Sequence, residues 1–331
     1  MRLSVISTMY RSASFLPDFY QRVTNECQRI TDDYEIIFVN DGSPDESREV
    51  SLALYHADSH VRVIDLSRNF GHHKAIQAGL NHALGELIFL IDCDLEEPPE
   101  LLGTFYEALQ SHLNIDIIYG VQEQRKGKWF ESVTGQFYYK LFNLMADVKM
   151  PENQLVARLM TFRYIQALLK HHESELTIAE LCALNGFEQL ALTVHKGSRG
   201  ESSYTLTTKL YYMIKSIVFF SNRPLIFISV LGGLITLVAF VIIGYMISVF
   251  LLFGRPPEGY SSLIVSIWFV GGLTIFSVGI LALYLSITLA QIKQRPTFIV
   301  RERFEHMPNG HSKPQPELDL ATMNHNRHDH V

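Results

Sequence analysis

Two aspartates and a glutamate, Asp92, Asp94 and Glu96, directly follow the short apolar run at residues 87–91. A run this short, bounded by turn-forming residues, is typical of a buried strand in a parallel sheet, and open α/β sheets bind ligands beyond the carboxyl ends of such strands. Residues two apart point to one side of an extended chain, so these oxygens suit Mg²⁺ or Mn²⁺ carrying a diphosphate. The alternative is a solvated acidic turn before the helix that begins at Pro98.

Strands and helices alternate through the first 120 residues, which predicts an α/β domain with a mostly parallel sheet. The turn at residues 41–45 has the Asp, Gly, Ser and Pro residues of a strand-to-helix connection. Predicted strands cover residues 3–7, 34–40, 61–67, 87–91 and 115–119; predicted helices cover 14–30 and 98–112, and two more end at 56 and 84.

Composition excludes several classes of protein. The net charge of −6 argues against a nucleic-acid partner. The three cysteines are far apart and form no CxxC pair, so neither a disulfide framework nor a zinc site is predicted, and a reducing compartment fits best. The apolar part of residues 1–12 is too short for a secretory signal and is expected to form the first strand.

Two long segments, residues 225–253 and 261–292, contain no charged residue. Each exceeds the roughly 20 residues that span a bilayer, and a buried pair of soluble helices rarely reaches this length without a charge. Residues 224–292 are therefore predicted to form two transmembrane helices with a short hairpin at 254–260. Lysine and arginine flank both sides of this region, so the positive-inside rule places the N-terminal region and both termini in the cytoplasm.

Two more segments are candidates for helices at the membrane surface. Residues 129–148 carry aromatic side chains at helical spacing, which fits core packing and an interfacial helix equally well. Residues 206–223 are predicted to form a juxtamembrane amphipathic helix. A β-prone segment at 293–304 precedes a polar tail, 305–331, that is predicted to be disordered; its histidines could bind a metal, but a solvated tail is the preferred interpretation.

Four motifs in a fixed order precede the two predicted spans: Asn40-Asp41-Gly42-Ser43, Arg68-Asn69-Phe70-Gly71, Asp92-Cys93-Asp94-Leu95 and Pro98-Pro99. With this order, residues 3 to 300 resemble the GT-A glycosyltransferases that load sugars onto polyprenyl phosphate. That group includes dolichyl-phosphate mannose synthase and the bacterial undecaprenyl-phosphate glucosyl- and aminoarabinosyl-transferases. The resemblance implies a GT-A (Rossmann-like) domain over residues 1–205 and a multi-pass enzyme of the bacterial inner membrane. The implied reaction is transfer, with inversion, from a nucleotide-sugar, taken to be a UDP-sugar, to undecaprenyl phosphate.

The resemblance also implies roles for residues of the donor site. Thr8 and Tyr10 stand where the family contacts the nucleotide, and Asp41 stands where an acidic residue reaches the base or ribose. Asp92 belongs to the Asp-x-Asp motif, which binds the donor with the help of Mg²⁺ or Mn²⁺. Glu96 stands where the family often has a metal-binding Gln, and a carboxylate is a compatible hard ligand. The implied metal ligands are Asp92, Asp94 and Glu96.

Positively charged side chains are implied to hold the phosphate of the acceptor. Asp94 and Arg158 are the residues expected to be catalytic. The residues implied for the acceptor phosphate are Arg125, Arg158, Lys196 and Arg199.

In the loop after the fifth predicted strand, Gln122 stands where the family commonly has a first Arg, whereas Arg125 is kept. Three further departures from the family pattern lie elsewhere in the chain. Tyr10 is followed by Arg11-Ser12 instead of Asn-Glu, Val156 stands where the family commonly has an acidic residue, and Ser203 replaces a lysine. The chemistry tolerates the loss at Val156, because the nucleophile is a phosphate oxygen. The second pKa of such a phosphate is about 6, so attack on the anomeric carbon requires no proton removal.

Two other functions compete with this one. A processive polysaccharide synthase shares the sheet and the Asp-x-Asp motif, but it would show Gln-x-x-Arg-Trp and more spans, whereas Arg125 is followed by Lys126. A membrane-anchored scaffold with a decayed site is favoured by the three departures and opposed by the intact Asp92, Asp94 and Arg158.

The segment at residues 295–300 is β-prone and has no obvious partner in its own chain. Such a strand invites pairing with another sheet. In the bacterial relatives this segment crosses to a neighbouring subunit of a tetramer, so the resemblance implies a homotetramer. The alternative is that the segment folds back on its own sheet.

Overall fold

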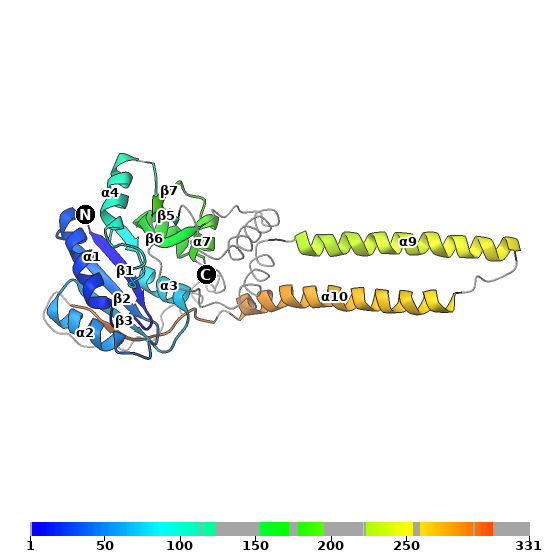
Figure 1. Cartoon of the computed structure of the whole chain (residues 1–331), viewed down its shortest axis with the longest axis horizontal. Helices are drawn as coiled ribbons and strands as arrows, with labels where there is room; N and C mark the ends of the chain where they lie inside the picture. Colours follow the sequence, from blue (N-terminus) through cyan, green and yellow to red (C-terminus); the bar gives the residue numbers. More distant parts are fainter. Residues whose placement is uncertain are drawn as a thin grey trace, which may run out of the picture. The chain divides into compact units, whose positions relative to one another are not determined.

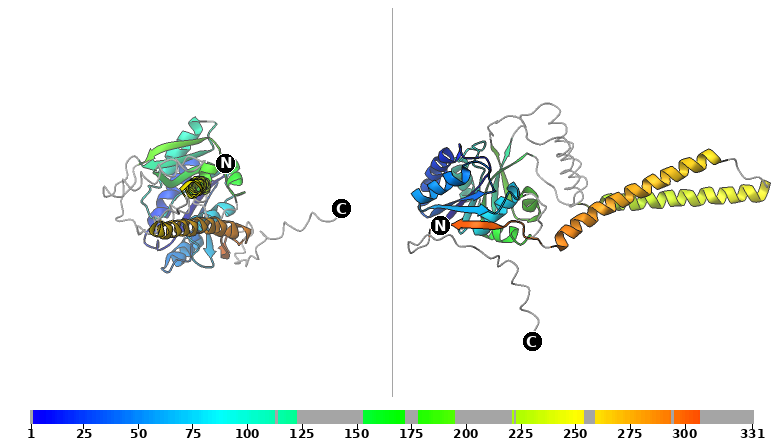
Figure 2. Two further views of the ribbon diagram at one scale, coloured as in Figure 1. Left: turned by 90° about the vertical axis from the view of Figure 1, so that its right-hand side faces the viewer. Right: turned by 90° about the horizontal axis from the view of Figure 1, so that it is seen from below.

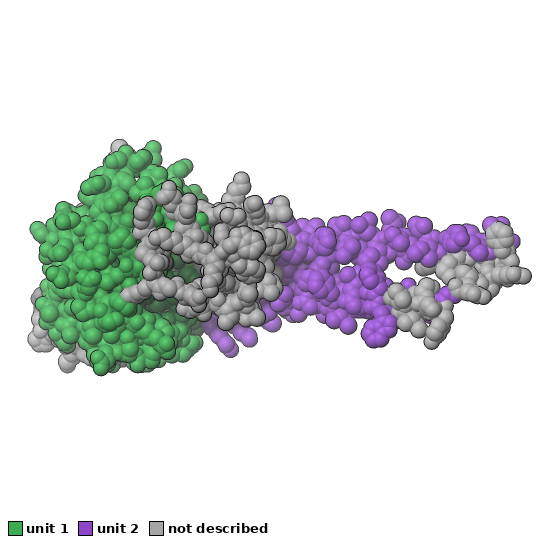
Figure 3. Space-filling model, viewed as in Figure 1, with its two compact units in different colours: residues 1–135, 150–202, 296–331 green, residues 136–149, 203–295 purple. Residues whose placement is uncertain are grey.

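The computed structural model describes residues 2–112, 114–122, 153–171, 178–194, 221, 223–253, 259–293 and 295–306. The chain divides into two compact units (Figure 3). The first contains residues 1–135, 150–202 and 296–331, and the second contains residues 136–149 and 203–295. The first unit therefore joins the N-terminal part of the chain to its C-terminal end.

A mixed sheet forms the centre of the first unit (Figure 1). Within the described residues its strand order is β7-β5-β6-β4-β1-β2-β3-β8, and only β6 and β8 run antiparallel to their neighbours. The strands are β1 Leu3–Met9, β2 Tyr34–Asn40, β3 Val61–Leu66, β4 Leu87–Leu90, β5 Ile117–Gln122, β6 Gln154–Thr161, β7 Gln189–Val194 and β8 Val300–Phe304. The predicted fold class, α/β with a mostly parallel sheet, is confirmed.

Helices cover both faces of the parallel strands, so every residue of β1 is buried. Successive side chains of a strand face opposite sides. Val5 and Met9 belong to a core cluster that also includes residues of α1 and α4. On the other face α3 packs so closely that a Cβ on Gly79 would lie 2.4 Å from Ile6 Cγ2. The helices of this unit are α1 Leu16–Ile30, α2 Ser47–Ala57, α3 His72–His82, α4 Leu101–Ser111, α6 Phe162–Leu168 and α7 Ile178–Leu184.

Most of the predicted elements are present with small shifts of their ends. β2 has the predicted bounds, and α1 and α4 begin two or three residues later than predicted. The strands β6 and β7 and the helices α6 and α7 were not predicted. The reason lies in their composition, because β6 has Arg158 at its centre and β7 is only partly buried, so neither forms an apolar run.

The second unit contains two long apolar helices, α9 Arg223–Phe253 and α10 Tyr260–Ile292, which run beside each other (Figures 1 and 2). Segments Arg223–Val249 and Ser266–Ile292 have mean hydropathies of 2.9 and 2.1, and neither is buried. Both are long and apolar enough to cross a membrane, as the sequence predicts. The predicted surface helix at 129–148 lies outside the described residues, as do most of 206–223 and of the hairpin.

After α10 the chain returns to the sheet, where β8 pairs antiparallel with β3. The expectation that this segment has no partner in its own chain is wrong. Without β8, β3 would be an edge strand with unpaired N–H and C=O groups, and β8 covers that edge. Glu305 and His306 also belong to the docked segment, because His306 stacks on Tyr55 with ring centroids 4.1 Å apart. The tail predicted to begin at residue 305 is corrected for these two residues, and 307–331 lie outside the described residues.

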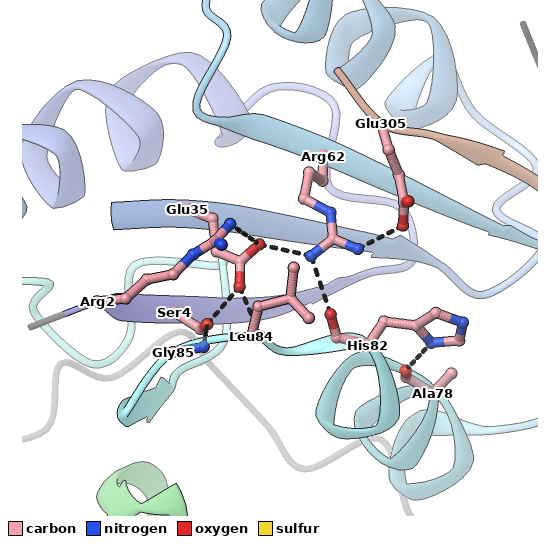
Figure 4. A network of polar contacts seen from close by, with 9 residues as sticks. All are labelled: Arg2, Ser4, Glu35, Arg62, Ala78, His82, Leu84, Gly85 and Glu305. Atoms are coloured by element: carbon pink, nitrogen blue, oxygen red, sulfur yellow. Dashed lines mark hydrogen bonds and ion pairs between the residues drawn. The ribbon is translucent and has the colours of Figure 1, made fainter. Parts of the chain in front are cut away.

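A buried ion network fixes β8 to the amino-terminal ends of the central strands (Figure 4). Arg62 on β3 lies between Glu35 on β2 and Glu305, and it donates to both carboxylates. Glu35 is 2% exposed and also accepts hydrogen bonds from Ser4 Oγ at 2.5 Å and the Leu84 N–H at 2.7 Å. Since each charge has several partners, this network stabilises the sheet and ties the C-terminal segment to it.

Candidate active site

The residues singled out in the sequence lie beyond the carboxyl ends of four adjacent strands. Thr8 and Tyr10 are at the end of β1, and Asp41 follows β2. The loop at 68–71 follows β3, and the loop at 92–97 follows β4. Because β4, β1, β2 and β3 are adjacent and parallel, these segments meet at one edge of the sheet, where open α/β sheets bind ligands.

Asp41 holds the loop after β3 in place. Its carboxylate accepts hydrogen bonds from the N–H groups of Phe70, at 2.7 Å, and Gly71, at 3.0 Å. The residue is 2% exposed, and burial raises the pKa of its carboxyl group, against the effect of the two N–H donors. Both of its oxygens thus bind backbone groups of the neighbouring loop, and the expected contact of Asp41 with a base or ribose stays a prediction.

Gly42 allows the same two segments to touch. Its φ is +60°, and a Cβ there would lie 2.5 Å from the Asn69 nitrogen. A larger residue would need both an unfavourable backbone conformation and a displaced loop. The Asn-Asp-Gly-Ser and Arg-Asn-Phe-Gly motifs thus form one packed unit.

The turn after β1 is fixed to the turn after β2. The Arg11 N–H donates to Ser43 Oγ at 2.7 Å, and Asp45 accepts from the Ala13 N–H at 3.1 Å. Tyr10 remains 47% exposed above this turn, with the Arg11 guanidinium 5.7 Å from its ring centroid. Tyr10 is therefore accessible to a ligand, as its predicted role requires, and Arg11 in the position of the family's Asn adds a cation beside it.

His72, the first residue of α3, connects two of the predicted donor-site residues. Its Nδ1 lies 3.1 Å from Thr8 Oγ1, and its Nε2 lies 3.6 Å from Asp92 Oδ1. Desolvation lowers the pKa of His72, although the carboxylates of Asp41, Asp94 and Glu97 act in the opposite direction. The imidazole is therefore neutral at pH 7. Sequence reasoning missed His72, although its place directly after the Arg-Asn-Phe-Gly motif was a signal.

The acidic loop after β4 turns instead of continuing the strand. Asp94 Oδ1 accepts a hydrogen bond from the Glu96 N–H at 3.0 Å, and Leu95 has a φ of +62°. Cys93 is buried and donates from Sγ to the Thr8 carbonyl at 3.1 Å, whereas Asp92 and Asp94 are partly exposed. The prediction of carboxylates at the end of a buried parallel strand holds, but the extended geometry used to argue it does not.

The structure contains no ligand, and the fit of a divalent cation is judged from the side chains. No three His, Cys, Asp or Glu side chains come together as a metal site within the described residues, so Asp92, Asp94 and Glu96 do not form a three-carboxylate centre by themselves. The partly exposed oxygens of Asp92 and Asp94 fit the usual arrangement for Mg²⁺, in which one or two carboxylates share the ion with substrate phosphates.

Glu97, which the sequence analysis did not single out, fastens the acidic loop to β6. It is 1% exposed, and its two oxygens accept from the N–H groups of Val156, at 3.1 Å, and Ala157, at 2.6 Å. β4 pairs with β6 only as far as Leu90, opposite Arg158, so these two N–H groups lie beyond the end of β4. Buried N–H groups need acceptors, and the Glu97 carboxylate replaces the missing strand. A buried carboxylate thus lies against the backbone of Val156, the position where the family commonly has an acid.

Arg158 is buried on β6 with its guanidinium fully engaged in hydrogen bonds. It is 1% exposed on β6, and Nε and Nη2 donate to the carbonyls of Val156, at 3.1 Å, and Leu155, at 2.9 Å. Its Nη1 donates to Cys182 Sγ at 3.0 Å. The buried guanidinium thus supports its own strand and contacts Cys182, and the expected role of Arg158 toward an acceptor phosphate stays a prediction. The other predicted cations, Arg125, Lys196 and Arg199, lie outside the described residues.

This arrangement combines an exposed aromatic ring, a neutral imidazole and partly exposed carboxylates at the edge of a rigid sheet. The aromatic ring can stack on a flat group such as a base. The carboxylates can hold a cation on a diphosphate. The site is therefore suited to a nucleoside diphosphate that carries a transferable group and can act as the leaving group.

A sequence model described as Glycosyl transferase family 2 matches residues 4–169. This match covers half of the chain and includes the whole edge described above. The chain belongs to glycosyl transferase family 2, whose members transfer sugars from nucleotide-sugar donors.

Relatives align along nearly the full length of the chain. A Mycobacterium tuberculosis protein described as "Putative glycosyltransferases" is 43% identical over 301 residues, which are 91% of this chain and 88% of that protein. The bactoprenol glucosyl transferase of Shigella phage SfII is 28% identical over 310 residues, 93% of this chain and 100% of the phage protein. Among solved structures, mannosyl-3-phosphoglycerate synthase from Rubrobacter xylanophilus is 15% identical, covers 68% of this chain and 74% of that one, and has a TM-score of 0.46.

Proposed function

We propose that this protein transfers a sugar, with inversion, from a UDP-sugar to the phosphate of undecaprenyl phosphate. The product is a lipid-linked sugar that serves as a donor for cell-surface polysaccharide or lipid modification. The observation that carries the proposal is the combination of a nucleotide-sugar site with two apolar helices in one chain. The names of the phage and bacterial bactoprenol glucosyl transferases support a polyprenyl-phosphate acceptor.

On the donor side, Tyr10 contacts the nucleotide and Thr8 orients His72 beside it. Asp92 and Asp94 hold Mg²⁺ or Mn²⁺, and Glu96 is the proposed third carboxylate of the loop. When bound, the cation stabilises the negative charge that develops on the leaving diphosphate. Asp41 and Glu97 contribute indirectly, because they fix the loops that carry these groups.

The acceptor side requires positive charge rather than a general base. The acceptor phosphate is largely ionised at neutral pH because its second pKa is about 6. Val156 in place of an acid is then compatible with activity. We assign the acceptor phosphate to Arg125, Lys196 and Arg199, because arginine matches phosphate with two parallel hydrogen bonds. Neutralising any of them is expected to raise the KM for undecaprenyl phosphate more than the KM for the donor, and unchanged acceptor kinetics in all three variants would place the phosphate elsewhere.

The proposed location is the bacterial inner membrane, with the sheet domain and both termini in the cytoplasm. The excess of lysine and arginine on both flanks of α9 and α10 supports this topology. A cysteine-reactive probe that cannot cross membranes tests it. A single cysteine introduced at residue 257, in a chain without its three native cysteines, should react in intact spheroplasts, and one introduced at residue 312 should react only after lysis.

The proposed assembly is a homotetramer, by family likeness. Light scattering of the full-length protein in detergent measures the oligomer mass, which for a tetramer is about four times the chain mass of 37.8 kDa. A full-length protein that is already monomeric in detergent excludes the tetramer.

The decisive test of function is synthesis of a glycolipid. Purified full-length protein is incubated with undecaprenyl phosphate, Mn²⁺ and each of several radiolabelled nucleotide-sugars, and the lipid phase is counted. We expect label in the lipid phase with a UDP-sugar. Absence of product with every donor would favour a membrane-anchored scaffold, the alternative suggested by Val156, Ser203 and Arg11-Ser12.

A further inference from the structure

His72 presents its two ring nitrogens to two different site residues. Nδ1 lies 3.1 Å from the Thr8 hydroxyl, and Nε2 lies 3.6 Å from Asp92 Oδ1. The position of the ring is well defined, since Gly71 ends the preceding loop with its N–H bound to Asp41 and His72 begins a regular helix. The residue therefore sits at the centre of the donor site, beside the first carboxylate of the acidic loop.

The two distances from the His72 ring nitrogens correspond to different kinds of contact. A separation of 3.1 Å is a hydrogen bond, whereas 3.6 Å is too long for one between Nε2 and Asp92. When Nδ1–H donates to Thr8, Nε2 directs a lone pair toward the Asp92 carboxylate. In this tautomer a cation between Nε2 and Asp92 Oδ1 replaces the repulsion between the lone pair and the carboxylate with two metal bonds. Two ligands of one cation with bonds of about 2.1 Å lie roughly 3 to 4 Å apart, which includes the observed separation.

We infer that His72 Nε2 is a ligand of the divalent cation of the donor site, next to Asp92. This inference rests on the proposed function, because the cation is the one that carries the donor diphosphate. The Nδ1 contact with Thr8 has the form found at metal sites, where a ligating histidine donates its other ring N–H to a protein oxygen.

Two consequences follow from a nitrogen ligand. The described residues do not bring three ligating side chains together. The donor diphosphate therefore completes the coordination shell of the cation. As a result, Mn²⁺ is expected to bind tightly only in the presence of UDP. An imidazole also favours Mn²⁺ over Mg²⁺, because Mg²⁺ prefers oxygen ligands and transition metals accept nitrogen.

Pulsed electron paramagnetic resonance of bound Mn²⁺ tests the inference without measuring turnover. Full-length protein in detergent is mixed with Mn²⁺ and UDP, and couplings to ³¹P and ¹⁴N are recorded. We expect both couplings in the native protein, with the nitrogen coupling changed by uniform ¹⁵N labelling of the protein but not of UDP. His72→Gln should lose the nitrogen coupling, keep the phosphorus coupling and bind Mn²⁺ at least about 10-fold more weakly.

His112→Gln is the matched control, because His112 is an exposed histidine at the end of α4 in the same unit. It should retain both couplings and the native affinity. A native spectrum with phosphorus but no nitrogen coupling would mean an oxygen-only shell and would overturn the inference, as would a nitrogen coupling that persists in His72→Gln. Failure of the proposed function has a different signature, namely a nitrogen-coupled Mn²⁺ site in a protein that forms no glycolipid with any donor.

Discussion

The two ends of the central strands both carry charged side chains, but the two groups differ in exposure. At the amino-terminal ends, Glu35 and Arg62 are 2% and 8% exposed, and each has several charged or hydrogen-bonding partners. At the carboxyl ends, Asp92 and Asp94 are partly exposed on a loop that turns away from the sheet. Burial with a full set of partners marks charges that hold the fold, and partial exposure at a strand end marks charges that can bind a ligand.

Asp94→Asn is expected to have the largest effect on activity. Loss of the charge removes several kcal/mol of transition-state stabilisation by the cation, which corresponds to about 10³-fold in rate. The melting temperature should be unchanged, because the side chain is partly exposed. Glycolipid formation and a thermal melt of the same preparation measure both. A variant that keeps most of its Mn²⁺-dependent turnover would remove Asp94 from the metal shell.

Arg62→Met is expected to have the largest effect on stability. The substitution leaves Glu35 buried without its main cation, which typically costs about 3–5 kcal/mol. Chemical denaturation followed by circular dichroism of the β-sheet measures the loss. Arg22→Met is the control, because Arg22 and its partner Glu100 are both partly exposed, and such a pair contributes at most about 1 kcal/mol. Equal losses in the two variants would contradict the structural role given to the network.

Gly42→Ala is expected to lower both stability and activity, each by less than the two preceding variants. Both Gly42 and Gly186 have positive φ, but a Cβ on Gly42 meets the backbone of Asn69 and one on Gly186 meets nothing within 4 Å. Gly186→Ala should therefore cost about 1 kcal/mol from backbone strain alone. Gly42→Ala should cost more and should raise the KM for the donor. A donor KM unchanged in Gly42→Ala would show that the two packed motifs do not shape the donor site.

Asp45→Ala is expected to have the smallest effect, and that effect should depend on pH. Burial would raise the pKa of Asp45, but hydrogen bonds from Ser43, Ser47 and Ala13 lower it to about 2. A lowered pKa gives stability that is present above the unfolded value near 3.9 and is lost as the pH falls toward 2. The variant should lose about 1 kcal/mol at pH 7.

The measurement is a series of melting temperatures between pH 7 and pH 2.5 for the native protein and Asp45→Ala. The gap between the two curves should narrow as the pH falls below about 4, because the carboxyl group of the unfolded chain is protonated there while the folded one stays ionised down to about pH 2. A gap that is constant over this range would mean that the charge of Asp45 has no part in the turn.

The parallel half of the fold was predictable because each strand is a local apolar run followed by turn residues. Asp92 could be placed at a strand end on this basis, and β2 was predicted with its observed bounds. The antiparallel half was not predictable, because the burial of Arg158 on β6 depends on strands and helices far away in the sequence. Asp41 was located correctly at a strand end, but its observed contacts could not be predicted, since they come from a loop 29 and 30 residues later.

The dependence on contacts distant in sequence also explains why the roles of Glu97 and His72 were not predicted. The role of Glu97 depends on N–H groups 59 and 60 residues away, and no local sequence pattern predicts these contacts. His72 follows a recognised motif, but its importance comes from its approach to Thr8 and Asp92 on two other strands. Motifs therefore locate a site, and contacts distant in sequence decide which of its residues face the ligand.

The pairing of β8 with β3 has a consequence for biosynthesis. β3 ends at Leu66 and its partner begins at Val300, so the ribosome makes α9 and α10 before it makes the strand that completes the sheet. Until then β3 has an open edge, and Arg62 lacks Glu305. The sheet domain therefore reaches its final structure only after both apolar helices have been synthesised, so the sheet is completed after both segments that are long and apolar enough to cross a membrane.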